Sequence, residues 1–468
     1  MNKQTKARRE FLKDIGLGAA ALGVASCGKA SKPEADAEKG ILLRFPIKEK
    51  WETEVLVVGG GPAGIGAAMG AARQGVETLL IENHGFFGGV AAWSLGMPIN
   101  QVRPKGKPRS NVHELLIQKL TGFGSQAVTI KDHQMWCNVD YLKAAIVDAL
   151  DECGVKYCLH ARAVDSVVEG NRITGVIAAT KQGTVFIKAG VVIDGTGDAD
   201  VAYFAGAETM KEVGKLSPMT LLIKVTNVNL EKAKKVDMKA MAEKARSKYP
   251  LIPPSWRFED NDPSSNSFYI NHSCLRDLGP FDASDPESFT KAECLARHQA
   301  IQMVEAMREF GGDALKDIEL IGTSPQIAVR ETRRVKGVYV LTEEDALKGR
   351  TFEDTIAWRS GFLDIGYVYL AEMKIHDVPY RSILPEKLDG MLVGGRCISA
   401  SHVAASAGKS MGNCMATGHA GGLAAAMSVK KNIVPRELNV KELQDALRAE
   451  NVDLTMGGQD QEGLALIG

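Results

Sequence analysis

Val-Val-Gly-Gly-Gly-Pro-Ala-Gly, at residues 57–64, is the stretch of this 468-residue sequence that decides the fold. Its first two residues, Val57 and Val58, end the apolar run Glu54–Val58. This run predicts a strand that is buried on both faces of a sheet. A helix rich in Ala and Gly is expected from about Pro62 to Gln74. Val76–Glu82 then predicts a second strand. A strand, a glycine-rich turn and a helix in this order predict a dinucleotide-binding unit.

Each small residue of this turn has a physical role. Gly59 permits the tight turn, Gly61 lets the backbone approach a pyrophosphate, and Gly64 lets the helix pack on the strand. The helix start, at Pro62 and Ala63, offers unpaired N–H groups and a positive dipole end to phosphates. All five residues are therefore expected to bind the cofactor.

Glu82 ends the second strand, 18 residues after Gly64. At this position a carboxylate can accept hydrogen bonds from ribose hydroxyls. The same motif binds NAD and FAD, so the choice between them rests on segments further along the chain. Only one complete Gly-x-Gly-x-x-Gly is present, whereas a reductase with its own NAD(P)H domain usually has a second.

Two further strand-to-glycine turns are predicted, at residues 190–198 and 390–396. The first of them follows a predicted strand and a small β-meander, with strands at 155–160, 163–168, 172–180 and 184–188. Three strand-to-glycine turns around one dinucleotide are typical of a flavoprotein, which favours FAD.

Taken together, these segments resemble the FAD-dependent oxidoreductase family of glutathione-reductase-like, two-dinucleotide-binding-domain flavoproteins, which is related to the flavin module of heterodisulfide reductase. The likeness runs from about Thr53 to Val429. Besides the turns, it is carried by the glycine pair at 88–89 and by residues 161–176 (ARAVDSVVEGNRITGV), 324–357 (SPQIAVRETRRVKGVYVLTEEDALKGRTFEDTIA), 378–402 (VPYRSILPEKLDGMLVGGRCISASH) and 413–431 (NCMATGHAGGLAAAMSVKK).

The resemblance implies that FAD is the cofactor. It places the backbone of Val164 at the adenine. It also places the start of the last helix, with Asn413 and Met415, at the N1–C2=O edge of the isoalloxazine, where the helix dipole stabilises negative charge. The other residues that it places around FAD are Gly88, Gly89, Asp198, Gly395 and Arg396. The small residues of the last helix are equally consistent with close packing; they are Ala416, Gly418, Gly421 and Gly422.

The predicted fold class is α/β: a Rossmann-like FAD-binding domain, with a parallel sheet and a small β-meander, and an inserted α+β capping domain for the substrate. In the insertion we expect a strand at Met219–Val228, helices at Glu231–Lys248 and Phe289–Phe310, and a loop or lid at Leu251–Asp285. The predicted boundaries are a signal peptide at 1–26, a lipidated tether at 27–50, FAD-binding parts at 51–207 and 379–435, the capping domain at 208–378, and a C-terminal helical tail at 436–468.

Flavin chemistry needs few protein groups, chiefly a base for one proton and an arginine to clamp a carboxylate. Motif position makes His402, Arg330, Arg333 and Tyr380 the catalytic candidates. His402 is the expected base because it follows the third glycine turn. Alternatively, the cluster at 330–334 forms an internal salt-bridge network or contacts FAD. No metal site is predicted, because none of the eight cysteines forms a Cys-x-x-Cys pair.

The first residues have the order of a signal peptide rather than of a fold. The pair Arg8–Arg9 precedes a short apolar run at 15–26, which resembles a twin-arginine signal. Val-Ala-Ser-Cys, at 24–27, resembles a lipobox with Cys27 as the lipidated residue. The alternative is a disordered basic leader with a chance cysteine. We therefore expect an exported protein of the cell envelope or periplasm, anchored to a membrane by lipid.

Composition limits the partners. The formal net charge is zero, with 57 basic and 57 acidic residues and no basic stripe, so nucleic-acid binding has no support. We expect a dehydrogenase that takes hydride from a small organic substrate onto flavin N5. It would pass electrons to an envelope acceptor such as a quinone, a cytochrome or a separate iron–sulfur protein. The alternatives are a terminal reductase like fumarate reductase and a non-catalytic FAD-stabilised binding protein.

Overall fold

The computed structural model describes residues 47, 49–107, 109–131, 134–258, 267–270, 275–361, 363–365, 369–370 and 373–460. The predicted signal peptide, Cys27 and nearly all of the predicted tether lie outside these residues. All the elements below belong to one unit of the chain, residues 46–468. Among the described residues, no helix combines the length and the apolarity that crossing a bilayer requires.

The central sheet confirms the predicted dinucleotide-binding unit. Its parallel strands lie in the order β6 (Lys156–Cys158), β2 (Thr78–Ile81), β1 (Glu49–Val58), β9 (Gly183–Asp194) and β19 (Met391–Val393). Helix α2 (Pro62–Ala72) connects β1 to β2, as expected from the glycine-rich turn. The central segments 55–58, 80–81, 191–193 and 391–393 are apolar and buried, because both faces of the sheet are covered there.

The meander is antiparallel and continues from the same sheet. β7 (Arg162–Glu169) pairs with β8 (Arg172–Thr180), and β8 pairs with the first half of β9. The sequence predicted two separate strands at 184–188 and 190–194, but β9 runs through both. Gly190 lies within β9 and does not interrupt it. A Cβ at Gly190 would lie 2.9 Å from the carbonyl oxygen of Glu54 on the neighbouring strand. This glycine therefore serves close backbone approach within the sheet.

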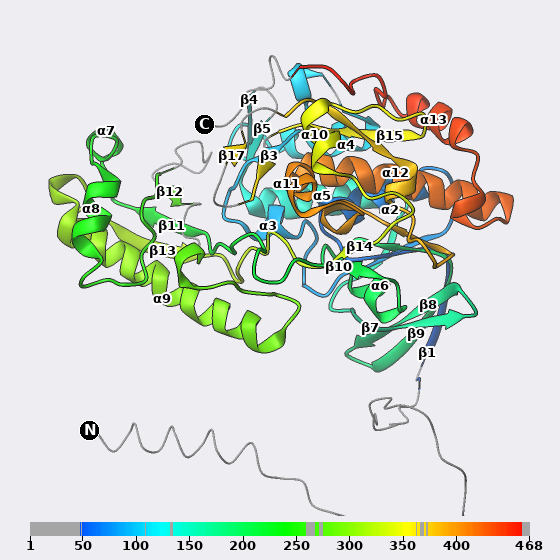
Figure 1. Ribbon diagram of the computed structural model, residues 1–468, viewed down its shortest axis with the longest axis horizontal. Helices are drawn as coiled ribbons and strands as arrows, with labels where there is room; N and C mark the ends of the chain where they lie inside the picture. The colour runs from blue at the N-terminus through cyan, green and yellow to red at the C-terminus, as the bar shows by residue number, and fades with distance from the viewer. Residues whose placement is uncertain are drawn as a thin grey trace, which may run out of the picture. The chain divides into compact units, whose positions relative to one another are not determined.

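Helix α12 (Met411–Lys431) packs directly on α2, and Figure 1 shows the two side by side. A Cβ on Gly418 would overlap the carbonyl of Ala63, and one on Gly422 would overlap the carbonyl of Ala67. Close packing is therefore the role of these two glycines. Because the contacts advance together along both helices, α2 and α12 run in the same direction. Their N-termini both face the ends of the strands.

The insertion forms a separate small α+β layer with its own hydrophobic core. Its sheet has the order β12 (Ser267–Ile270), β11 (Ile223–Thr226), β13 (Glu319–Thr323), and the long helix α9 (Pro286–Phe310) packs on β13. Figure 1 shows these elements gathered as one group, in green. A cluster that includes Trp93, Trp136, Leu222 and Tyr269 joins this layer to the first part of the chain.

Three predictions for the insertion are corrected. The strand expected at Met219–Val228 is only four residues long, and the loop expected at Leu251–Asp285 contains β12. The helix expected at Glu231–Lys248 is two helices, α7 (Leu230–Ala233) and α8 (Met238–Ala245). Asp237 separates them, because its side chain accepts a hydrogen bond from the Ala240 N–H and begins a new helix.

In the described part of the predicted C-terminal tail, residues 436–460, the α-helix is α13 (Val440–Ala449), and residues 451–460 contain no helix. The remaining elements are α3 (Val90–Trp93), β3 (Ile99–Asn100), α4 (Asn111–Thr121), β4 (Val128–Lys131), β5 (Gln134–Cys137), α5 (Val139–Glu152), α6 (Asp200–Phe204), β10 (Thr209–Met210), β14 (Arg334–Val335), α10 (Glu343–Lys348), β15 (Thr355–Arg359), β16 (Leu363–Asp364), β17 (Tyr369–Leu370), β18 (His376–Pro379) and α11 (His402–Gly408).

Candidate functional site

The three predicted glycine turns meet at one edge of the sheet. In the parallel register, Val58 of β1 pairs with Asp194 of β9, and Asp194 pairs with Val393 of β19. All three strands therefore end at the same level, and their turns leave the sheet together. Ligands of open α/β sheets bind at this carboxyl edge.

The turns are also in direct backbone contact. A Cβ on Gly59 would lie 2.8 Å from the carbonyl oxygen of Gly195 in the second turn. A Cβ on Gly395, in the third turn, would lie 2.7 Å from the Cβ of Ala63. Gly59 and Gly395 both have positive φ, at 95° and 81°, which side chains disfavour. Glycine is thus required at the points where the turns converge.

The first turn forms an open cradle. A Cβ on Gly64 would overlap the Gly59 carbonyl, so this glycine packs the helix on the strand, as predicted. A Cβ on Gly61 would meet nothing within 4 Å. No side chain caps the start of α2, which leaves its first N–H groups to other acceptors. Gly88 and Gly89 have φ of 111° and 50°, and a Cβ on Gly89 would lie 2.9 Å from the Gly61 Cα.

Glu82 lies beside this cradle and is only 6% exposed. One carboxylate oxygen accepts from the backbone N–H of Gly60 at 2.6 Å. The other accepts from the backbone N–H of His84 at 2.8 Å and lies 2.7 Å from its Nδ1. The hydrogen bond to Glu82 raises the pKa of His84 above its ordinary value, although burial opposes it. His84 Nε2 in turn lies 3.0 Å from the side-chain oxygen of Gln326.

The role of His84 beside the ribose acid is one that sequence reasoning missed. The available signal was its position two residues after Glu82. Its second partner, Gln326, is 242 residues away along the chain, so local pattern could not reveal it. His84 thus links Glu82 to the segment that follows β13, which contains Gln326.

Val164, predicted to meet the adenine through its backbone, is the bulged residue of β7. The register with β8 passes from Ala163 to Asp165 without pairing it. Val164 is 40% exposed. The segment that leads into β7 begins beside the ribose acid, because the Ala161 N–H donates to the Glu82 carbonyl at 2.9 Å. A bulge leaves its backbone groups available to a ligand, so the adenine role of Val164 stays a prediction.

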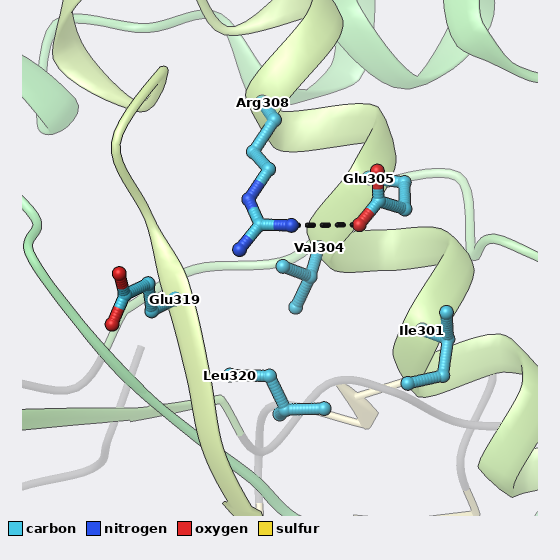
Figure 2. Close-up of a pocket in the computed structure, with 6 residues that line it drawn as sticks. All are labelled: Ile301, Val304, Glu305, Arg308, Glu319 and Leu320. Carbon is cyan, nitrogen blue, oxygen red and sulfur yellow. Dashed lines mark hydrogen bonds and ion pairs between the residues drawn. The ribbon is translucent and has the colours of Figure 1, made fainter.

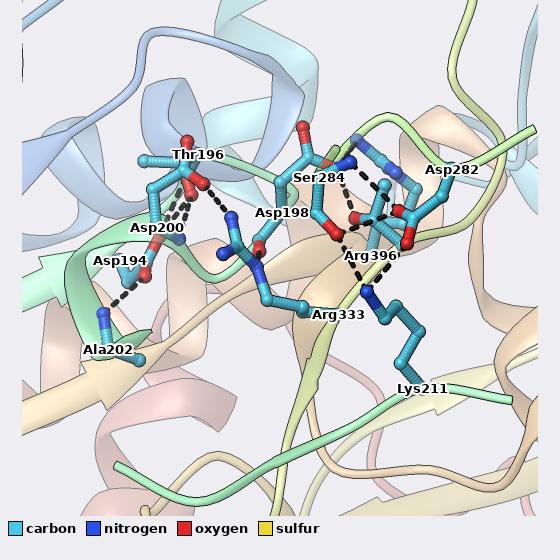
Figure 3. Close-up of polar contacts among 11 residues, drawn as sticks. Asp194, Thr196, Asp198, Asp200, Ala202, Lys211, Asp282, Ser284, Arg333 and Arg396 are labelled. Atoms are coloured by element: carbon cyan, nitrogen blue, oxygen red, sulfur yellow. Dashed lines mark hydrogen bonds and ion pairs between the residues drawn. The ribbon is translucent and has the colours of Figure 1, made fainter. Parts of the chain in front are cut away.

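Asp198 and Arg396 face each other between the second and third turns, as Figure 3 shows. Arg396 Nη2 pairs with the Asp198 carboxylate at 2.8 Å, and that carboxylate also accepts from the Thr332 hydroxyl. Arg396 Nη1 is buried and has no hydrogen-bond partner within the described residues. A buried donor of this kind requires an acceptor, such as an anionic ligand.

Arg333 is held by internal partners in the same view (Figure 3). Its Nε donates to the Asp198 carbonyl at 3.0 Å, its guanidinium pairs with Asp200, and its Cζ lies 4.3 Å from the ring centroid of Tyr203. Burial and the charge of Asp198 raise the pKa of Asp200 to about 6. These contacts favour the alternative of a salt-bridge network, and the catalytic role of Arg333 stays a prediction.

Arg334 is the centre of that network and is 1% exposed. Its guanidinium pairs with Glu331 and with Glu212, and its Nε donates to the Ala400 carbonyl at 2.8 Å. The Ser217 N–H and hydroxyl donate to Glu331 at 3.0 and 3.1 Å. The network links the start of the insertion to the third glycine turn.

His402, the predicted base, starts α11 and joins this network. Its Nδ1 lies 2.8 Å from a Glu331 carboxylate oxygen, and its side chain is 15% exposed. Burial raises the pKa of Glu331, but the His402 hydrogen bond and the Arg334 charge together hold it below its ordinary value. One ligand atom each of Glu212, Glu331 and His402 lie within 4.8 Å of one another. Both carboxylates already pair with Arg334, which favours an ion-pair network over a metal site there.

The remaining predicted residues lie around the same turn and the start of α12. Arg330 is half-buried near Lys409; burial and the Arg330 charge hold the pKa of Lys409 well below its ordinary value. Asn413 is fully buried, and its Nδ2 donates to the Ser360 carbonyl at 2.9 Å. Its Oδ1 has no partner in the described part of the chain. Met415 is buried on the side of α12 that faces α2.

The sequence model of the family described as "FAD dependent oxidoreductase" matches residues 54–447. The chain belongs to this FAD-dependent oxidoreductase family. The match spans the three glycine turns, the insertion between them and most of α13. The protein is thus an FAD-dependent oxidoreductase with a Rossmann-like domain, and FAD is its cofactor.

Other known proteins are similar to this oxidoreductase over parts of their length. Thiamine thiazole synthase from Aeropyrum pernix is 28% identical over 200 residues, 40% of this chain and 71% of that protein. Digeranylgeranylglycerophospholipid reductase 1 from Methanococcoides burtonii is 28% identical over 177 residues, 34% of this chain and 41% of that protein. A solved geranylgeranyl bacteriochlorophyll reductase-like protein from Thermoplasma acidophilum superposes with a TM-score of 0.47 at 14% identity, covering 89% of this chain and 90% of that one.

The residues of the oxidoreductase fit FAD in three respects. The space over Gly61 and the uncapped start of α2 suit a pyrophosphate. The Glu82 carboxylate beside them suits a ribose. The unused Arg396 Nη1 and the unused Asn413 Oδ1 offer one donor and one acceptor to the flavin end. Bound FAD would supply hydride and electron transfer at this edge of the sheet.

Glu82→Gln should weaken FAD binding about 10- to 100-fold, because a charge-assisted hydrogen bond is worth roughly 1.5–3 kcal/mol. Glutamine keeps the shape of the Glu82 side chain but loses its negative charge. That charge strengthens the contacts of the side chain with the Gly60 N–H and with His84. Titration of the apoprotein with FAD, followed by flavin fluorescence, measures the change. Glu305→Gln, on an exposed helix face, is the matched control; an unchanged FAD affinity in Glu82→Gln would remove Glu82 from the site.

Tyr380, predicted as a catalytic residue, has a buried side chain whose contacts favour a structural role. It is 2% exposed, and its hydroxyl donates to the Pro435 carbonyl at 2.8 Å, at the start of the tail. Burial raises its pKa far above the ordinary value, so the phenol stays neutral. Tyr380 lies beside the third turn in the sequence, but its side chain points into the core.

Tyr380→Phe should therefore reduce the free energy of unfolding by about 1 kcal/mol, the usual net value of one hydrogen bond. FAD affinity and turnover should stay as in the wild type. Chemical denaturation and a flavin titration on the same preparation measure both quantities. A variant of normal stability that loses its turnover would restore the catalytic interpretation.

One pocket in the described part of the chain, with a volume of about 360 Å³, lies elsewhere, on α9 and β13 of the insertion. Figure 2 shows the ion pair of Arg308 and Glu305 above it, with Ile301 and Leu320 on the apolar side. None of its residues belongs to a glycine turn or to α11. We therefore assign the chemistry to the turns and not to this pocket.

Proposed function

We propose that this FAD-dependent oxidoreductase is a dehydrogenase that oxidises an alcohol carbon of a small organic substrate. The observation that carries the proposal is the His402–Glu331 pair, placed by α11 directly after the third glycine turn. A histidine whose other nitrogen is oriented by a carboxylate is the usual form of a general base. The glutathione-reductase-like subclass remains part of the proposal, on the motifs of the sequence.

In this proposal His402 takes one proton. The Glu331 carboxylate can only accept hydrogen bonds, so Nδ1 carries the hydrogen between them and Nε2 keeps its lone pair. Nε2 would take the O–H proton of the substrate, and bound FAD would supply the acceptor for the hydride of the same carbon, so that the alcohol becomes a carbonyl. Arg334 holds Glu331 in place. The uncapped start of α12 offers a positive dipole end that would stabilise negative charge on bound FAD.

The electrons then leave to an acceptor in the cell envelope, by class a quinone, a cytochrome or an iron–sulfur protein. The leader at 1–26 with its Arg8–Arg9 pair and the candidate lipidation site Cys27 support export and anchoring at a membrane. Globomycin-sensitive processing and labelling of the full chain with a palmitate analogue test the anchor. A Cys27→Ala chain that still takes up label would contradict it.

Electron flow in the opposite direction is the second candidate. It is favoured by the partial similarity to a protein named as a reductase, the phospholipid reductase from Methanococcoides burtonii. In that case His402 would give a proton to the substrate instead of taking one. The same ion-pair network would hold it, so geometry does not separate the two directions.

Anaerobic mixing of the FAD-loaded chain with sugars, hydroxy acids and other alcohols tests the dehydrogenase. At least one substrate class should bleach the flavin band near roughly 450 nm, and a soluble quinone should restore it. If no alcohol bleaches the band, while reduced protein is reoxidised by an enoate, the reductase direction replaces the proposal.

A further inference from the structure

Two arginine side chains are buried near the start of α12 without a carboxylate. Arg359, the last residue of β15, is 1% exposed, and its Nε and Nη1 have no acceptor in the described part of the chain. Arg109 is 4% exposed, and among the described residues its acceptors are the backbone oxygens of Gln101 at 3.3 Å and of Trp358. Its guanidinium also lies 4.0 Å from the Trp358 ring centroid.

The electrostatics of this arginine pair are unfavourable without a ligand. Burial and the charge of Arg359 lower the pKa of Arg109 to about 9, and burial lowers the pKa of Arg359 to about 10. The one group that counteracts both shifts is the thiol of Cys414, whose own pKa burial raises to about 11. That thiol is therefore neutral at pH 7. Both guanidiniums stay charged there, and two buried cations require a compensating anion.

Other buried polar atoms near Arg359 are also without partners. A side chain at Gly408 would overlap the guanidinium, so glycine at this position makes room for it. His376 of β18 lies opposite Arg359 of β15 in the strand register. It is fully buried, and its Nε2 has no partner within the described residues. The Ser410 hydroxyl does not cap α12, so the positive end of this 21-residue helix is open to an anion.

Helix α11 connects this arginine pair to the proposed base. His402 is its first residue, and its last residue is Gly408, against which the Arg359 guanidinium lies. At 1.5 Å per residue, their Cα atoms are about 9 Å apart along the helix. The Arg359 guanidinium and the His402 imidazole therefore lie at the two ends of one short helix.

We propose that Arg359, supported by the charge of Arg109, binds the carboxylate of the substrate, so that the enzyme acts on a small organic acid of the hydroxy-acid or sugar-acid class. The proposal rests on the proposed function for the reacting end of the molecule. The planar guanidinium offers two parallel N–H groups to a carboxylate, a geometry that fixes orientation as well as charge. The hydroxyl carbon would then lie toward His402.

Binding to the full, FAD-loaded and oxidised chain tests this site without turnover. Lactate, malate and gluconate are titrated by calorimetry, with lactamide as the neutral counterpart of lactate. At least one acid should bind, and lactamide should not. Arg359→Met should weaken acid binding about 100-fold, the expected loss for a bidentate charged contact. Arg448→Met, on exposed α13, is the matched control and should bind as the wild type does.

Arg359→Met should fold, because it removes a buried charge that pairs with no carboxylate of the described residues, and its Tm should equal or exceed that of the wild type. Arg359→Lys keeps the charge but loses the fork, and should bind the acid about 10-fold more weakly than the wild type. The proposal is overturned if no acid binds the wild type, or if Arg359→Met binds acids normally. It is also overturned if that variant loses FAD affinity and keeps acid binding. An acid that binds but never bleaches the flavin would contradict the dehydrogenase and leave this site intact.

Discussion

Gly61→Ala should lower FAD affinity by about 100-fold, or nearly 3 kcal/mol, while leaving the apoprotein as stable as the wild type. The apo fold has no reason to change, because a Cβ at this position meets nothing within 4 Å and its φ is −73°. The open space is the space that a pyrophosphate would occupy at the start of α2. Denaturant unfolding of the apoprotein and an FAD titration separate the two effects.

Two other glycines frame this prediction. Gly322→Ala also introduces a methyl group where nothing lies within 4 Å, but on β13 of the insertion, and FAD affinity should not change. Gly64→Ala should destabilise the fold itself, because its Cβ overlaps the Gly59 carbonyl. If Gly61→Ala binds FAD as tightly as Gly322→Ala does, the pyrophosphate does not lie over the first turn.

His402→Asn should lower kcat by about 10²- to 10⁴-fold, the range expected when a general base is removed. FAD content should stay unchanged, because His402 contacts Glu331 and not the residues that line the first turn. The acidic limb of the kcat profile against pH, which reports the base, should disappear. Stopped-flow reduction of the flavin by the substrate measures the chemical step alone.

His298→Asn is the matched control for this variant. His298 lies on the exposed face of α9, and its ring nitrogen bonds to the Cys294 carbonyl one turn earlier. Its removal should not change the rate of flavin reduction. If His402→Asn reduces the flavin at the wild-type rate and with the wild-type pH profile, the histidine is only a member of the ion-pair network.

The parts of the site that could be predicted from the sequence are the parts encoded by short local patterns. A β-branched strand followed by glycines specifies its own turn, so the three turns and Glu82 could be placed from the amino-acid order alone. That the turns share one edge followed from the parallel sheet, and the register of Val58, Asp194 and Val393 confirms it.

Residues whose role depends on a distant partner could not be predicted. Arg334 pairs with Glu212 across 122 residues, and the two ends of the His84–Gln326 contact are 242 residues apart. The cluster at 330–334 could therefore be identified, but the role of each of its residues could not be assigned. The burial of the Tyr380 side chain could not be predicted from its position beside the third turn. Arg109 and Arg359 carry no motif, because their significance lies in what surrounds them.

The absorbance spectrum of the purified full chain tests the central claim most directly. We expect a flavin band near roughly 450 nm. Denaturation should release about one FAD per protein chain, and the apoprotein should take FAD up again. A folded protein that is purified without flavin, and that binds no FAD on titration, would contradict the assignment of the three glycine turns.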